Sequence, residues 1–117
     1  MKKFFLLLAL TIYIHSVSAQ CTSIDANKIN TLTDKVSKQH LDNNKIKIIQ
    51  DYLNTDCIKS TQLITLLKFL NFEEDKITII KKAYSKLEDP QNISEIFKLL
   101  EFESSKKEIQ TFIQGLK

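Results

Sequence analysis

Apolar residues recur along this chain at intervals of three and four positions, the spacing of one face of an α-helix. We expect six short helices, each with its apolar face turned inward. The first two are expected over about residues 23–38 and 43–54. The other four are expected to begin at polar or acidic positions suited to a helix N-terminus, at Ser60 or Thr61, near Glu73, at Asn92 and at Ser105.

Turn-forming residues are scarce. The chain contains one glycine, Gly115, and one proline, Pro90. Strand-rich folds need residues that accept a positive φ in their tight turns, and few are present here. Pro90 restricts the residue before it and cannot continue a helix, so we expect the fourth helix to end near Asp89. These features favour an all-α fold.

A repeat of about thirty residues runs through the second half of the chain. Residues 68–73 (KFLNFE) are echoed by residues 98–103 (KLLEFE), and a run beginning at Asn44 matches one beginning at Asp75. Each unit reads as a pair of short helices that cannot bury its own apolar face, so neighbouring pairs must stack. We therefore predict a compact bundle of about six helices, built from two and a half helical-hairpin repeats. Five phenylalanines near the helix ends are expected to fill its core: Phe69, Phe72, Phe97, Phe102 and Phe112.

The first nineteen residues have the pattern of a cleaved signal peptide. A positive start at Lys2 and Lys3 precedes an apolar stretch over residues 4–14, and small residues stand at Val17-Ser18-Ala19. The apolar stretch is shorter than the roughly 20 residues of a membrane span, so an uncleaved anchor is the weaker alternative. We expect a signal peptide at 1–19, an N-terminal segment with one helix at 20–41, and the repeat domain at 42–117.

Charge excludes some partners. The chain has 17 basic and 14 acidic residues, and loss of Lys2 and Lys3 leaves 15 against 14. All the basic residues are lysine. A near-neutral chain without arginine argues against nucleic-acid binding and against a polybasic membrane patch.

The chain contains two cysteines, Cys21 and Cys57, and both follow the expected cleavage site. An even pair in an exported chain indicates one disulfide. The alternative is a reactive thiol at Cys57, but no histidine neighbours it and Lys59 is the nearest cation in sequence.

Candidate chemistry is sparse. His40 is the single histidine beyond the signal segment, and Asp42 alone would not complete a metal site, so we expect an exposed loop histidine. Glu73, Glu74 and Asp75 suit the positive end of a helix better than a calcium loop, which would need a central glycine. We therefore expect no enzyme activity, no metal and no cofactor.

Two tyrosines, Tyr52 and Tyr84, lie toward the ends of equivalent predicted helices. A tyrosine ring can be buried while its hydroxyl reaches water. We expect these two residues to form the wall of a binding groove.

Several segments together resemble a known family, the domain of unknown function 4476. The similarity extends from about Asp42 to Ile113, and the segments that carry it are residues 56–63, 72–84, 89–92 and 102–109. The resemblance implies an exported bacterial protein with no assigned activity and no functional residues to carry over. It also implies a cysteine at Cys57 and often another near the mature start, which supports the disulfide. Family members often have aromatic residues where this chain has Ile93 and Ser94.

The function that these features favour is an exported protein-interaction module, secreted or periplasmic, that binds an unknown protein or cell-surface partner. Repeated helical hairpins commonly serve such binding. The alternative is a small carrier of an apolar ligand or lipid, with a pocket between helix pairs near Tyr84 and the phenylalanines.

Overall fold

The computed structural model describes Cys21 and residues 24–117, so the predicted signal peptide lies outside the described residues. Within this part of the chain all the regular structure is helical, which confirms the all-α prediction. The six α-helices are α2 (Ala26–Ser37), α3 (Asp42–Leu53), α4 (Ser60–Leu67), α5 (Glu73–Tyr84), α6 (Ile93–Phe97) and α7 (Glu103–Gly115), and a short 3₁₀ helix, η2 (Pro90–Asn92), precedes α6.

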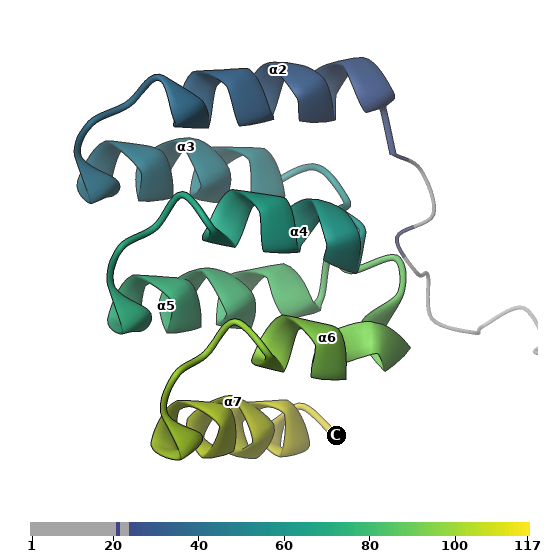
Figure 1. The fold of residues 1–117 in the computed structure, drawn as a ribbon. Helices are drawn as coiled ribbons and strands as arrows, with labels where there is room; N and C mark the ends of the chain where they lie inside the picture. Colours follow the sequence, from purple (N-terminus) through teal and green to yellow (C-terminus); the bar gives the residue numbers. More distant parts are fainter. Residues whose placement is uncertain (1–20, 22–23) are drawn as a thin grey trace, which may run out of the picture.

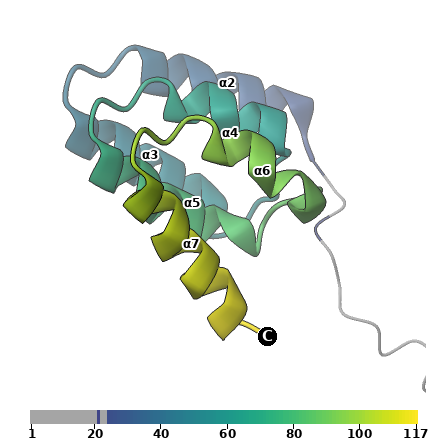
Figure 2. The same cartoon turned by 60° about the horizontal axis from the view of Figure 1, so that its bottom comes forward.

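The helices form three antiparallel hairpins stacked in one direction (Figure 1). The first hairpin is α2 with α3, the second is α4 with α5, and the third is α6 with α7. Turning the molecule separates two layers, with α2, α4 and α6 in one and α3, α5 and α7 in the other (Figure 2). Within the second layer α5 packs between α3 and α7. The predicted stacking of helical hairpins is therefore confirmed.

One apolar core joins the three hairpins, and all six α-helices contribute buried side chains to it. Val36, Ile49, Leu67, Ile80 and Ile96 are fully buried. The repeat also extends into the loops, because the core includes Leu70 and Leu100. These equivalent loop leucines close the ends of the second and third hairpins.

The loops within the hairpins lie together at one end of the stack, which we call the loop edge (Figure 1). Here the first residue of one helix holds the loop of the next hairpin. Oδ2 of Asp42, which begins α3, accepts a hydrogen bond of 2.8 Å from the backbone N–H of Asn71. Oε2 of Glu73, which begins α5, accepts hydrogen bonds from the backbone N–H groups of Glu101 at 3.0 Å and Phe102 at 3.1 Å. In the first and second hairpins, one carboxylate thus binds the loop of the following hairpin. We call this repeated contact the carboxylate ladder.

The opposite end of the stack has a second set of links. The backbone N–H of Ile58 donates to the carbonyl of Lys86, and the N–H of Glu88 donates to the carbonyl of Ile58. Asp89 accepts hydrogen bonds from the N–H of Ser60 at 2.8 Å and from its hydroxyl at 2.6 Å. The cap predicted at Ser60 is thus supplied by a residue of the next hairpin, since Ser60 is the first residue of α4.

Asn92 is the N-cap residue of α6, as predicted, but the cap predicted at Ser105 is wrong. The side chain of Asn92 donates to Asp89 and makes no capping bond to α6. Ser105 lies inside α7 and is buried, because the helix begins two residues earlier at Glu103. Asn92 thus bonds to a residue three positions earlier, and Phe102 takes the N-cap position of α7 that was expected at Ser105.

A disulfide between Cys21 and Cys57 ties the segment before α2 to the turn between α3 and α4, which confirms the predicted pairing. Close to it, Nζ of Lys28 forms an ion pair of 3.2 Å with Asp56. Both contacts connect the first hairpin to the turn that leads into the second. The disulfide is expected in a chain that folds in an oxidising compartment.

Replacing both cysteines by serine should destabilise the protein by about 3–4 kcal/mol, because the disulfide closes a loop between residues that are 36 positions apart. Urea denaturation of the oxidised protein and of the double variant measures this difference. The double variant also serves as the control for reduction: dithiothreitol should weaken the native protein and leave the variant unchanged. Equal stability of the two proteins in the absence of reductant would contradict the prediction.

Candidate functional site

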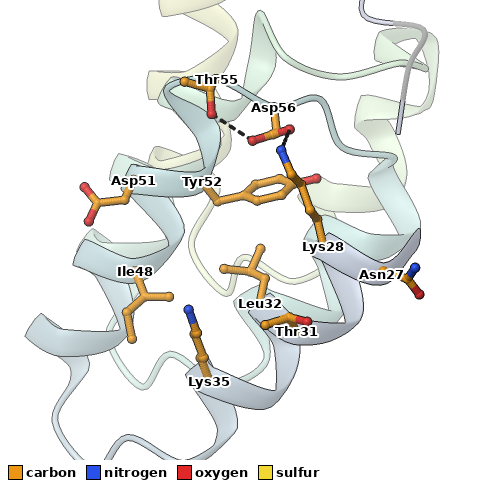
Figure 3. A pocket seen from close by; sticks show the side chains of 10 residues that line it. All are labelled: Asn27, Lys28, Thr31, Leu32, Lys35, Ile48, Asp51, Tyr52, Thr55 and Asp56. Carbon is orange, nitrogen blue, oxygen red and sulfur yellow. Dashed lines mark hydrogen bonds and ion pairs between the residues drawn. The ribbon is translucent and has the colours of Figure 1, made fainter. Parts of the chain in front are cut away.

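An open groove runs between α2 and α3 beside Tyr52 (Figure 3). We call it the Tyr52 groove. Its volume is about 500 Å³, and the side chains of Leu32, Ile48 and Tyr52 line it together with polar residues from both helices. Lys28 and Asp56 pair across one end of it, and Thr55 donates to Asp56 at 2.7 Å. The groove combines apolar side chains with charged groups.

The Tyr52 hydroxyl is already engaged in the fold. It donates a 2.7 Å hydrogen bond to the backbone carbonyl of Cys57, beside the disulfide. Burial, together with the negative charges of Asp56 and Asp25, raises the pKa of the Tyr52 phenol. The phenol therefore stays neutral near pH 7, and its ring is available to a ligand as an apolar surface.

Tyr84, the other tyrosine predicted for the groove wall, does not line the Tyr52 groove. It is half-buried near the end of α5 and packs against the core. His40 is exposed in the loop between α2 and α3, as expected. Among Cys21 and residues 24–117, no group of three or more histidine, cysteine, aspartate or glutamate side chains could hold a metal ion.

A second surface lies on the loop edge, and the sequence reasoning missed it. Leu41, Phe72 and Phe102 are 65%, 64% and 56% exposed, although they are large and apolar. Each is the N-cap residue of the second helix of its hairpin, α3, α5 or α7. We call these three residues the apolar row. The prediction that Phe72 and Phe102 fill the core is wrong, because at each loop the leucine two residues earlier, Leu70 or Leu100, is buried instead.

Carboxylates accompany the apolar row. A hollow of about 540 Å³ between the first and second hairpins, which we call the acidic groove, is bordered by Leu41 and Phe72. Its remaining lining residues are Asp42, Asn43, Glu73, Glu74 and Asp75. The acidic residues predicted at the start of the fourth helix do occupy the first turn of α5. In the structure, Glu73, Glu74 and Asp75 line the acidic groove.

Asp42 sits beneath this groove in a buried ion pair. Its side chain is 6% exposed and lies 3.5 Å from Nζ of Lys45, which is 11% exposed and also donates to the Phe69 carbonyl at 2.8 Å. Burial alone would raise the pKa of Asp42, but the hydrogen bonds from Asn71 and the nearby Lys45 ammonium lower it below its usual value. Asp42 is therefore ionised at neutral pH.

Asp75 has the opposite environment. Partial burial and the neighbouring carboxylates of Asp42 and Glu74 raise its pKa above the usual value. The charged form of Asp75 is therefore disfavoured in the folded protein, first by burial and then by its acidic neighbours.

Comparison with known proteins identified a matching family but no matching individual protein. The family model described as a domain of unknown function (DUF4476) matches residues 23–113, which include α2 to α6 and most of α7. Searches among curated proteins and among solved structures found no match. None of the helices in the described part of the chain has the length and apolar character of a membrane span.

Opposite effects on stability are expected from two carboxylates of the acidic groove. Asp42→Asn should cost about 3 kcal/mol at pH 7, because it leaves the buried Lys45 ammonium without its counter-charge. Asp75→Asn should raise the free energy of unfolding by roughly 0.5–1 kcal/mol at pH 7, because it removes a charge that its neighbours disfavour. Urea denaturation between pH 3 and pH 8 would measure both effects.

The pH dependence separates the two variants further. The folded-state pKa of Asp75 is raised, so its penalty is present at neutral pH and disappears as the pH falls through that pKa. The folded-state pKa of Asp42 is lowered, so its contribution is present at neutral pH and is lost only as the pH falls below the ordinary aspartate range. The gain from Asp75→Asn should therefore shrink at a higher pH than the loss from Asp42→Asn. Destabilisation by Asp75→Asn at pH 7 would show that the Asp75 charge is not disfavoured in the folded protein.

Proposed function

This chain belongs to the family of the domain of unknown function DUF4476, and from that premise we propose that it is an exported protein-interaction module that binds its partner through the apolar row. The observation that supports the proposal is the exposure of one large apolar side chain at the loop edge of each hairpin, at Leu41, Phe72 and Phe102. Each stands at the same position of its hairpin, on a scaffold with a continuous buried core.

Single exposed apolar side chains are common on protein surfaces and need no explanation. Several that recur along one edge form a larger apolar surface, which is typical of interaction sites. Stacked helical hairpins position such a row well, because each unit is held by its neighbours over an extended surface. At the loop edge, the hydrogen bonds from Asn71 to Asp42 and from Phe102 to Glu73 fix the loops that carry the row. A partner would then meet groups that are already ordered, which reduces the entropic cost of binding.

Export is part of the same proposal. The disulfide between Cys21 and Cys57 supports an oxidising location such as the periplasm or the exterior of the cell. The partner would then be another exported protein or a cell-surface component. The open grooves and the absence of a metal cluster among the described residues give no positive support for an enzyme.

The test is capture of partners from the exported fraction by the native protein and by a triple variant, Leu41→Ser, Phe72→Ser and Phe102→Ser. The triple variant should lose the specifically captured proteins. Its stability should change little, because surface substitutions usually alter the free energy of unfolding by no more than about 0.5 kcal/mol each. Leu116→Ser is the matched control, since Leu116 is 56% exposed and lies at the end of α7, away from the row.

Captured proteins that are the same for the native protein, the control and a folded triple variant would show that the apolar row is not the binding surface. Partners lost by the control as well would indicate general hydrophobic capture rather than recognition. Thermal denaturation of all three proteins confirms that the comparison is between folded molecules.

A second candidate, the carriage of a small amphiphilic ligand, is favoured by one observation. The Tyr52 groove has apolar side chains at Leu32 and Ile48 and charged groups at Lys35 and Asp51. Native mass spectrometry after incubation with a lipid extract would test it. A ligand that remains bound to native protein and is lost from a Leu32→Ser, Ile48→Ser variant would support carriage, whereas bare protein under gentle ionisation would count against it.

A further inference from the structure

The helices α3, α5 and α7 run side by side in one layer, and their N-termini all face the loop edge (Figures 1 and 2). Packed helices have axes that are about 8–10 Å apart. Leu41, Phe72 and Phe102 occupy the N-cap positions of these helices, so they recur along the edge at roughly that interval. A partner must therefore offer apolar groups with a similar spacing.

An α-helix laid across the edge comes close to this spacing. Seven residues of helix rise by about 10.5 Å and return to nearly the same face, so apolar side chains at every seventh position would each meet one residue of the row. A β-strand does not fit as well, because residues on one face of a strand recur about every 6.6–6.8 Å. A polyproline helix falls within this interval, with about 9.3 Å for each turn of three residues, so spacing alone does not separate it from the α-helix.

The chemistry of the row favours the α-helix over the polyproline helix. Leucine and phenylalanine side chains cannot form hydrogen bonds with the backbone of a bound segment. An α-helix satisfies its own backbone hydrogen bonds, so it needs only side-chain contacts from the surface that it covers. A polyproline segment has no internal hydrogen bonds, so any carbonyl that it buries against the row loses water without gaining a donor.

Charge identifies the residues that should flank the apolar positions. Four carboxylates line the acidic groove, and the side chain of the exposed Glu74 makes no hydrogen bond or ion pair with any described residue. Lysines occupy the other side of the loop edge, at the C-caps of α2, α4 and α6. Two of these, Lys38 and Lys98, are paired within their own hairpins with Asp34 at 2.9 Å and Glu95 at 3.0 Å. The third, Lys68, has no such pair among the described residues, but no basic side chain of that part of the chain lines the acidic groove, so the charge beside Leu41 and Phe72 is mainly negative.

We propose that the loop edge binds an amphipathic basic helix of a partner protein, which lies across α3, α5 and α7 with an apolar residue at every seventh position over the apolar row. Lysine or arginine side chains of that helix enter the acidic groove beside Glu74 and Asp75. This assignment rests on the proposed interaction function and adds the chemical class of the partner. The salt bridges would be formed near Leu41 and Phe72, where the groove adjoins the row.

The probe for the test is a synthetic, fluorescein-labelled helical peptide of about 18 residues, with leucine at three positions seven residues apart, lysines beside them, and alanine and glutamine elsewhere. Fluorescence anisotropy with the full exported chain measures the dissociation constant at low and high salt. One control peptide has the same composition with the leucines distributed around the helix. A second has glutamate in place of lysine, and a third is a proline-rich peptide with the same lysines.

The heptad lysine peptide should bind the native protein at least tenfold more tightly than each control peptide does. Phe72→Ser should weaken binding about tenfold or more, as expected for an apolar anchor, while Leu116→Ser should have no effect. Glu74→Gln should weaken binding about threefold and reduce the dependence on salt. Asp51→Asn is its matched control, since this exposed carboxylate belongs to the Tyr52 groove and should leave the affinity unchanged.

Absence of binding, or equal affinity for the heptad peptide and the permuted peptide, would overturn the proposal. Preferential binding of the glutamate peptide or of the proline-rich peptide would overturn it in favour of a different partner class. These outcomes are distinct from failure of the interaction function itself. If no basic helix binds but the triple variant still loses its captured partners, the row remains an interaction surface and only the class of partner is wrong.

Discussion

Each hairpin of this protein needs its neighbour for two reasons. Its short helices have too few buried positions to form a core alone, and in the second and third hairpins the loop N–H groups of Asn71, Glu101 and Phe102 bond to a carboxylate of the preceding hairpin. Stacking meets both needs at once: the apolar faces of α3, α5 and α7 close on one another while Asp42 and Glu73 accept the loop N–H groups of the following hairpin. The carboxylate ladder at the loop edge therefore fixes the register of the stack.

The ladder also determines where the surface chemistry lies. Since Asp42 and Glu73 must begin their helices to reach the next loop, the N-cap residues before them project outward at the edge. Leu41 and Phe72 are exposed at these positions, and Phe102 is exposed at the equivalent position before α7, while in the second and third hairpins the loop leucines Leu70 and Leu100 are buried instead. Asp75 has a raised pKa because it is partly buried and because α5 begins with three acidic residues close to Asp42 of the neighbouring hairpin. The stability of the stack and the exposure of the apolar row thus have one structural origin.

Contacts at the opposite end restrain the same stack differently. The disulfide and the Lys28–Asp56 ion pair hold the first hairpin, whereas Asp89 and the backbone bonds of Ile58 join the second hairpin to the third. A covalent link is found at the first hairpin, whose helix α2 is followed by a loop without the buried leucine of the later units. The Tyr52 groove lies beside this link, and the Tyr52 hydroxyl helps to hold the turn that carries Cys57.

The amino-acid sequence by itself determined the helical fold class, the stacking of hairpins, the core positions with helical spacing and the pairing of the two cysteines. These follow from periodicity, the lack of glycine and proline, and residue counts, all of which are local or compositional. Tertiary structure alone decided which phenylalanines are exposed, that Asp89 binds the N–H and hydroxyl of Ser60 at the start of α4, and that Asp42 and Asp75 share one groove. Those features depend on contacts between residues about thirty positions apart in the sequence. Such residues meet only when one hairpin packs against the next.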